Sequence, residues 1–247
     1  MPEIIIANEE YKQFLRCLNI IKESCDDVDI QEGIIRQRSN DHSGLIEIDL
    51  SEILQNATIP LIQLKNKLKL IEYFSGDVTI GLNDLDITFS DQYSSIKFSK
   101  PDQSYIDNKF ITEDELSTIF ILNVEDCILN QDIPKIVADR IRVTLNQFNV
   151  NRLNVLFEQE IASISAGTDS NEQTAKFLDN IIPNIPMNCH TDMIPLAFLV
   201  DNDNDINLKM YVVENNISAQ KFELNVGDID VNIYTRSILI ENEPVPE

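Results

Sequence analysis

Residues 76–99, GDVTIGLNDLDITFSDQYSSIKFS, form the stretch that decides the fold of this chain. Apolar and polar residues alternate from Val78 onward, and the alternation breaks at residues 83–84 and 91–92, where Asn, Asp and Gln stand. Turn-forming residues between alternating runs predict a three-stranded antiparallel meander. Because only every second side chain is apolar, one face of this sheet is expected to be buried.

The same pattern occurs again near the end of the chain, at residues 207–235, NLKMYVVENNISAQKFELNVGDIDVNIYT. The two halves are therefore expected to contain the same elements in the same order. The first half is predicted to contain a strand at 3–7, a helix at about 9–25, a hairpin of 28–39 and 45–50 around a turn at 41–44, a helix within 60–74, and the meander. The second half is predicted to contain a strand at 118–123, a helical stretch from about 124 to 147, a hairpin at 153–166, a helix near 188–200, and the meander.

This repetition predicts an α+β protein with two domains of similar build. We place the N-terminal domain at 1–100, an interdomain connector at 101–117 and the C-terminal domain at 118–247. The connector carries a proline and several acidic residues and shows no sustained alternation, which is typical of a linker. Both domains have an ordinary size for an independent hydrophobic core.

Several classes of protein are disfavoured by the sequence. The four cysteines are scattered without a C-x-x-C pair, and the two histidines have no partner at metal-ligand spacing, so we expect neither a disulfide framework nor a metal site. Glycine-rich phosphate loops and nucleophile motifs are absent, so we expect no cofactor and no enzymatic activity. No apolar run is long enough to span a membrane, and the thiol content fits a reducing compartment, so we expect a cytoplasmic protein.

The element order and the hydrophobic pattern resemble those of trimeric DNA polymerase sliding clamps. This family includes the clamp of T-even-type bacteriophages and proliferating cell nuclear antigen, and the resemblance is greatest over residues 48–98 and from Leu208 onward. It implies two tandem DNA-clamp domains with antiparallel sheets outside and helices inside. Three chains would then form a homotrimeric ring of pseudo-six-fold symmetry. The abundance of Asn, Ile, Lys and Asp and the lack of Trp fit an AT-rich coding genome, such as that of a bacteriophage.

The resemblance also implies a function and a set of partners. The chain would be a processivity factor that encircles double-stranded DNA without sequence preference and tethers DNA polymerase to it. An ATP-driven clamp loader would open and close the ring, and late-transcription factors are further partners that the family implies. If the chain is encoded by a phage, its compartment is the cytoplasm of the host cell.

The net charge of −23 argues against nucleic-acid binding if it is considered alone. The local distribution of charge decides what one face can bind, however, and basic residues recur on the predicted helices. Under the resemblance, the DNA-facing residues are Lys12, Arg16, Lys22, Lys65, Lys67, Lys69, Lys135, Arg140 and Arg142. In the alternative interpretation, these side chains only solvate the outer faces of amphipathic helices.

Partners of sliding clamps insert a short peptide with apolar anchors into a pocket beside the connector. The candidate residues for this pocket are Leu45, Phe110, Ile111, Ile238 and Leu239. The alternative is that these residues pack the junction between the domains.

Two other functions remain open from the sequence. The chain could be an acidic structural or adhesin-like phage protein, since strand-rich repeats and a low pI suit that class. It could also be a clamp relative that recruits partners without encircling DNA. The lysine-bearing amphipathic helices of the first half favour the clamp, because a virion β-protein has little use for them.

Overall fold

A computed structural model shows a chain that divides into two compact units. Unit 1 comprises Met1–Glu113 with Val226–Val231, and unit 2 comprises Asp114–Asn225 with Asn232–Glu247. For part of the second half the structure describes the backbone alone. The described residues are 3–22, 24–40, 44–102, 105, 110–120, 122, 124–148, 152–158, 161–167, 174–181, 188–191, 204–213 and 217–240.

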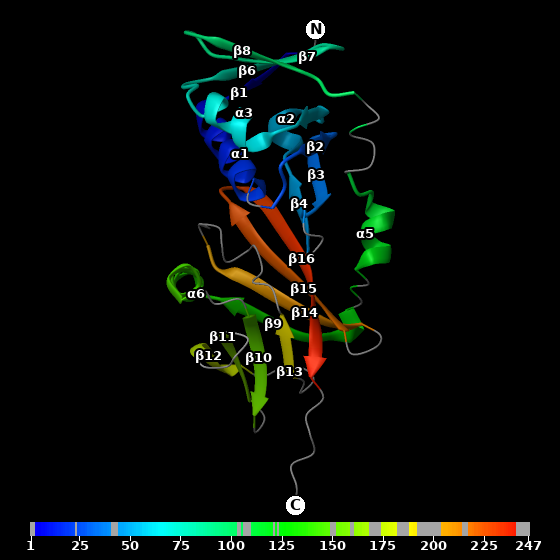
Figure 1. The fold of residues 1–247 in the computed structure, drawn as a ribbon, viewed down its shortest axis with the longest axis vertical. Coiled ribbons are helices and arrows are strands. Elements are labelled where there is room, and N and C mark those ends of the chain that lie inside the picture. The colour runs from blue at the N-terminus through cyan, green and yellow to red at the C-terminus, as the bar shows by residue number, and fades with distance from the viewer. Residues whose placement is uncertain are drawn as a thin grey trace, which may run out of the picture. The chain divides into compact units, whose positions relative to one another are not determined.

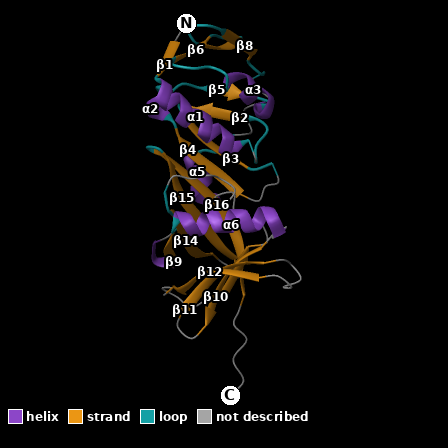
Figure 2. Cartoon of the chain, turned by 90° about the vertical axis from the view of Figure 1, so that its left-hand side faces the viewer, coloured by secondary structure: helices purple, strands orange, loops and turns teal. Residues whose placement is uncertain are grey.

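Among its described residues, unit 1 contains antiparallel sheets and the helices α1, α2 and α3 (Figure 1). Its elements in chain order are β1 (Glu3–Ile6), α1 (Asn8–Ile21), β2 (Val28–Gln31), β3 (Ile34–Arg38), β4 (Gly44–Asp49), α2 (Ser51–Leu54), β5 (Ile59–Leu61), α3 (Leu64–Ile71), β6 (Val78–Leu82), β7 (Asp86–Ser90) and β8 (Ser95–Ser99). One sheet has the strand order β1-β6-β7-β8, and the strands β4-β3-β2-β5 follow one another in the other sheet. Figures 1 and 2 show the helices in the region between these sheets.

The core of unit 1 forms where the apolar stripe of α1 meets the buried faces of the sheets. Tyr11, Phe14 and Leu18 are buried on α1, and Ile80 and Phe89 are buried on the meander. Full burial of each such side chain contributes about 1.5–3 kcal/mol. The alternating apolar residues that predicted the meander therefore form its buried face. All three predicted strands are present as β6, β7 and β8.

Side chains in the turns of the meander explain where its strands end. The Asn83 side chain accepts hydrogen bonds from the backbone N–H groups of Leu85 (2.8 Å) and Asp86 (2.7 Å), closing the β6–β7 turn. Asp91 does the same for Tyr93 (2.8 Å) in the β7–β8 turn, and it also accepts the N–H of Ser75 (3.1 Å). These donors lower the pKa of Asp91.

The described residues of unit 2 repeat the strands and the first helix of unit 1 in the same order. Before its first strand lie α5 (Glu113–Ile119) and the 3₁₀ helix η1 (Val124–Asp126). The repeated elements are β9 (Cys127–Ile133), α6 (Lys135–Phe148), β10 (Arg152–Glu158), β11 (Ile161–Gly167), β12 (Thr174–Ile181), β13 (Asn188–Thr191), β14 (Ile206–Val213), β15 (Ile217–Val226) and β16 (Ile229–Ile240). The first residues of β16, 229–231, group with unit 1.

The strand pairing of unit 2 corresponds to that of unit 1. β9 pairs with β14, and β15 follows β14 and precedes β16, as β1, β6, β7 and β8 do in unit 1. Likewise the order β12-β11-β10-β13 matches β4-β3-β2-β5. Figure 2 shows α6 lying across the strands of unit 2. The duplication predicted from the two meanders is thus present in the topology as well as in the sequence pattern.

The beginning of the second half differs from the prediction. Residues 118–119, expected in a strand, end α5, and the expected helix from about 124 is replaced by η1 and β9. The helix begins only at Lys135, whose N–H is bonded to the Asp205 side chain at 2.8 Å. Pro134 therefore precedes α6 and does not interrupt a longer helix, a position where the missing N–H of proline costs nothing. The sequence pattern did not predict β9, because this segment becomes a strand through its pairing with β14, which is distant in the chain.

Three local predictions also need correction. The stretch 28–39 forms two strands, because Glu32 and Gly33 adopt φ of 50° and 80° in a tight hairpin turn between β2 and β3. Leu61, assigned to a helix, lies in β5, and α3 begins at Leu64. Within the helix expected near 188–200, residues 188–191 form β13, and residues 192–200 lie outside the described part of the chain, as do residues 41–43 of the predicted turn.

Candidate nucleic-acid interface

In unit 1, α1 and α3 pack side by side and leave one face of each helix exposed. The Tyr11 hydroxyl donates to the Ile71 carbonyl at 2.8 Å, and this bond is buried. At the surface of the same seam, the Asn19 amide donates to Glu72 at 3.0 Å. These contacts fix the two helices against each other, so the basic side chains on their exposed faces are held by a rigid support.

The basic residues of α1 lie opposite its buried stripe. Lys12 is exposed and forms an ion pair of 2.6 Å with Glu9. Arg16, one turn later, is half-buried and also engaged. Lys22 follows the last residue of the helix, and its ammonium donates to Asn19. Lys12 and Arg16 are four residues apart and therefore lie on the same side of α1, where Glu9 accompanies them.

The three lysines of α3 do not share one environment. Lys65 and Lys69 are exposed, and Lys65 lies 3.9 Å from Asp26. The ammonium of Lys67 is buried, lies 5.2 Å from the centre of the Phe98 ring, and has no hydrogen-bond partner among the described residues. Burial lowers the pKa of Lys67, and the charge of nearby Asp27 opposes this shift. The structure thus presents Lys65 and Lys69 to solvent and packs Lys67 against β8.

In unit 2, α6 has a mixed exposed surface. Asp139 lies 3.8 Å from Lys135 and 2.9 Å from Arg142, so one carboxylate engages two of the three predicted basic residues. Arg140 is exposed on another side of the helix. Ile136 and Val143 are exposed as well, at 61% and 49%. Sequence reasoning did not single out these two apolar residues, although their i, i+7 spacing opposite the buried stripe places them on the outer face.

The helices carry a different balance of charge from the rest of the chain. Together α1, α3 and α6 contain eight of the 19 Lys and Arg residues but only three of the 42 Asp and Glu residues. The remainder of the chain is therefore still more acidic than the total suggests. A phosphate backbone would be attracted to these helical faces and repelled by most of the other surfaces.

The predicted peptide-pocket residues are only partly accessible. Phe110 forms an antiparallel bridge with Gln37 on β3, and the Arg36 guanidinium lies 5.9 Å from its ring centre. Ile111 donates its N–H to the Arg36 carbonyl at 2.8 Å and is 7% exposed, while Leu45 on β4 is 1% exposed. These three residues pack within unit 1, and a docking role for them stays a prediction. Ile238 and Leu239 lie in β16, paired with β13, and their side chains are outside the described set.

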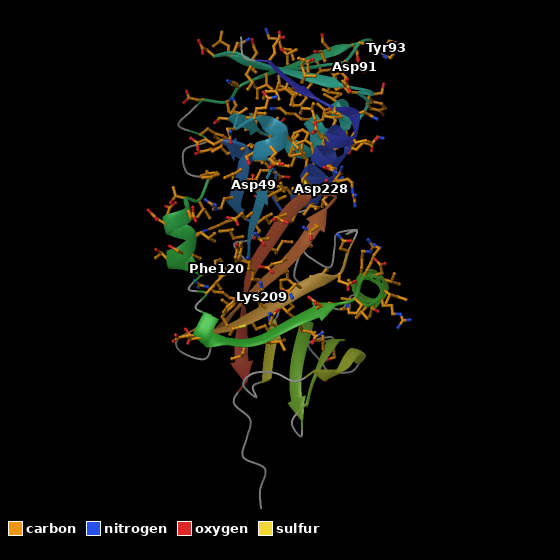
Figure 3. The ribbon with its side chains drawn as sticks, turned by 180° about the vertical axis from the view of Figure 1, so that it is seen from behind. Asp49, Asp91, Tyr93, Phe120, Lys209 and Asp228 are labelled. Atoms are coloured by element: carbon orange, nitrogen blue, oxygen red, sulfur yellow. The ribbon has the colours of Figure 1, made fainter. Side chains whose placement is uncertain are left out.

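A second charged cluster, not expected from the sequence, lies on the β14–β15 sheet of unit 2. Lys209 and Lys221 face each other directly across the two strands, and Glu223 accepts a hydrogen bond of 2.6 Å from each (Figure 3 labels Lys209). Burial alone would raise the pKa of Glu223, but the two lysines outweigh it and the pKa is lowered. Lys221 also lies 5.8 Å from the ring centre of Tyr234. Strand alternation could have placed these residues on one face, but their pairing required the register.

Among the residues that the structure describes, no group of three or more His, Cys, Asp or Glu side chains could hold a metal ion. Within the same residues, no helix has the length and hydrophobicity needed to cross a bilayer.

Solved structures share this fold along nearly the whole chain. The PCNA of A. fulgidus, bound to the C-terminal region of FEN-1, is 15% identical with a TM-score of 0.64, covering 98% of this chain and 100% of that one. The proliferating cellular nuclear antigen of Entamoeba histolytica is 12% identical with a TM-score of 0.63 and coverages of 95% and 98%. In the PCNA2–PCNA3 complex of Sulfolobus tokodaii, the values are 9%, 0.59, 96% and 99%.

Sequence comparison alone finds no such relationship. No protein-family model matches the chain, and no curated protein matches it. The likeness therefore lies in the arrangement of the elements, which includes both units, their duplicated topology and their order along the chain. The chain has the fold of the PCNA-like sliding clamps.

Proposed function

We propose that this chain is a DNA polymerase processivity factor, a sliding clamp that encircles duplex DNA as a homotrimer. The observation that carries the proposal is the concentration of basic residues on α1, α3 and α6 in a chain whose net charge is −23. In a clamp fold, these helices are the elements that line the central hole. A weakly basic lining inside an acidic ring attracts phosphate without holding it tightly, as sliding requires.

The same proposal implies DNA binding without sequence preference. Contacts to phosphates position a protein on DNA but carry no sequence information. The exposed residues of these helices include lysines and Arg140 beside Glu9, Glu10, Asn66 and a few apolar residues. The proposal needs from the basic side chains only contacts to phosphates. We propose further that the protein catalyses no reaction, and that a DNA polymerase and an ATP-driven loader are its partners. The FEN-1 complex of the A. fulgidus PCNA supports peptide docking as the mode of tethering.

The source and compartment belong to the proposal as well. A phage-encoded clamp would act in the cytoplasm of the host cell, and late-transcription factors would be among its further partners. The amino-acid composition, which fits an AT-rich coding genome, supports this origin.

The oligomeric state provides the first test. Light scattering at increasing protein concentration should give about three times the chain mass of 28.2 kDa. A closed ring buries the edge strands that would otherwise be exposed, so assembly is expected to be the stable state. A protein that remains monomeric at the highest concentration would contradict the ring.

Topological retention on DNA provides the second test and needs no loader. A long duplex is fixed to a bead at one end, the protein threads over the free end, and that end is then blocked with a bulky protein. High salt weakens phosphate contacts, so only an encircling ring should survive the wash. Cutting the duplex near the block should then release the protein. Equal release from cut and uncut DNA would show that the protein is not linked to the duplex topologically.

A further inference from the structure

The carboxylate of Asp139 lies between two of the basic residues that α6 offers to DNA. Its Oδ1 accepts a hydrogen bond from the Arg142 Nη2 at 2.9 Å, and its Oδ2 lies 3.8 Å from the Lys135 Nζ. All three side chains are partly accessible, with exposures of 36% for Asp139, 40% for Lys135 and 26% for Arg142. A DNA phosphate that approached Lys135 or Arg142 would therefore meet a carboxylate that already binds both.

Stabilisation of the helix is a weak explanation for this arrangement. Lys135 precedes Asp139 by four residues, which is the less favourable order for an i, i+4 pair, and the favourable order of Asp139 and Arg142 at i, i+3 stabilises a helix by only about 0.2–0.5 kcal/mol. Asp139 also lies beyond the first turn of α6, where a negative charge gains little from the helix dipole. Partly exposed ion pairs of this kind contribute little to folding. The position of Asp139 therefore affects phosphate binding by Lys135 and Arg142 more than it affects the stability of the helix.

We propose that Asp139 is an internal competitor for phosphate that weakens the hold of α6 on DNA. This inference rests on the proposed clamp function and concerns the strength of its DNA contact. A phosphate must displace the carboxylate before it can be bound by Lys135 or Arg142. Each phosphate contact therefore forms with a smaller net gain in binding free energy. The result is a lining that attracts the duplex but releases each phosphate easily, which lets the ring move along DNA.

Unit 1 shows the same arrangement in a weaker form. Lys12 is paired with Glu9 at 2.6 Å, and Lys65 lies 3.9 Å from Asp26. In both pairs each carboxylate engages a single lysine, and all four side chains are more than half exposed, so solvent screens the pair strongly. Asp139 is the clearest case because one acidic side chain restrains two basic ones.

The test is the salt dependence of binding to a labelled linear duplex, measured by fluorescence anisotropy between about 50 and 200 mM salt. Asp139→Asn should steepen the slope of log K against log salt by about 0.9 for each phosphate newly neutralised. With one such phosphate per subunit of a trimer, the slope steepens by about 2.7, and each contact tightens binding about tenfold at low salt. In single-molecule tracking, the variant should also diffuse more slowly along DNA.

A matched control separates this effect from the change in net charge. Asp86→Asn removes the same charge and releases Lys97 from an ion pair of 2.7 Å, but on the β7–β8 sheet. It should leave the slope unchanged. Adding Lys135→Gln and Arg142→Gln to Asp139→Asn should abolish the gain, because no released basic residue remains on that face.

The outcomes distinguish this inference from the function on which it rests. If Asp139→Asn and Asp86→Asn change the slope equally, or if the gain persists in the triple variant, the inference is wrong. If wild-type protein is retained topologically on DNA while Asp139→Asn behaves as wild type, only the inference fails. If wild-type protein is not retained at all, the clamp function itself fails. Thermal unfolding of each variant, expected to match wild type, confirms that folding is not the variable.

Discussion

Lys69 and Lys67 lie two residues apart on α3, and replacing each with Gln should have opposite consequences. Lys69 is exposed on the face that we propose lines the hole, so Lys69→Gln should remove about one phosphate contact per subunit. The slope of log K against log salt should then become shallower by about 0.9 per contact, or about 2.7 for a trimer. Because Lys69 is a surface residue, the free energy of unfolding should change by less than about 0.5 kcal/mol.

Lys67→Gln changes the charge by the same amount on the same helix, which makes it a matched control. Its ammonium is buried 5.2 Å from the centre of the Phe98 ring and is not available to phosphate. The variant loses a cation–π contact of about 0.5–2 kcal/mol but no longer buries a charge, so a moderate change in stability is expected, with an unchanged salt slope.

Fluorescence anisotropy with a short duplex measures both slopes, and urea denaturation measures both stabilities. Equal slopes for the two variants would refute the reasoning, because exposure on α3 would then not determine which lysine contacts DNA. A shallower slope for Lys67→Gln alone would show that the opposite side of α3 faces the duplex.

Two further substitutions test the fold and its pH dependence. Gly33→Ala should lower the free energy of unfolding by about 3 kcal/mol in urea, because φ is +80° and a Cβ would lie 2.5 Å from the Ser51 Cα, whereas Gly76→Ala, at φ +74° with open space, should cost about 1 kcal/mol. Glu223→Gln should cost about 1 kcal/mol at pH 7. The pKa of Glu223 is lowered in the folded state, so its contribution is present above the unfolded pKa of about 4.5 and is lost as pH falls through the folded value. The difference between wild type and this variant should therefore shrink in acid, and a difference at acidic pH as large as that at pH 7 would contradict the assignment.

The predictions from sequence succeeded where the deciding interactions are local. Alternation predicted both meanders, since period 2 follows directly from strand geometry. Helical spacing placed Lys12 and Arg16 on the exposed side of α1, because the stripe of Tyr11 and Phe14 fixes the buried side. Lys135 and Arg142 each contact Asp139 at the i, i+4 and i, i+3 spacings that a helix brings together, so these contacts also follow from local periodicity.

Local pattern failed where a distant partner decides the structure. β9 has an irregular order of buried and exposed residues and becomes a strand because it pairs with β14, about 75 residues later. The environment of Lys67 depends on Phe98 in β8, which no helical periodicity reveals. The register between β14 and β15 places Lys209 opposite Lys221, and a shift of one residue would have turned one of them to the other face.

The sequence by itself determined the two meanders, the amphipathic first helix of unit 1 and the unequal distribution of charge, because each depends on residues close together in the chain. Only the tertiary structure decided which strand begins the second repeat, which lysines of α3 are exposed, and how Lys209 and Lys221 come to share Glu223. The physical reason is that pairing, burial and ion contacts are formed between elements. A side chain's accessibility therefore depends on the neighbours that folding brings to it.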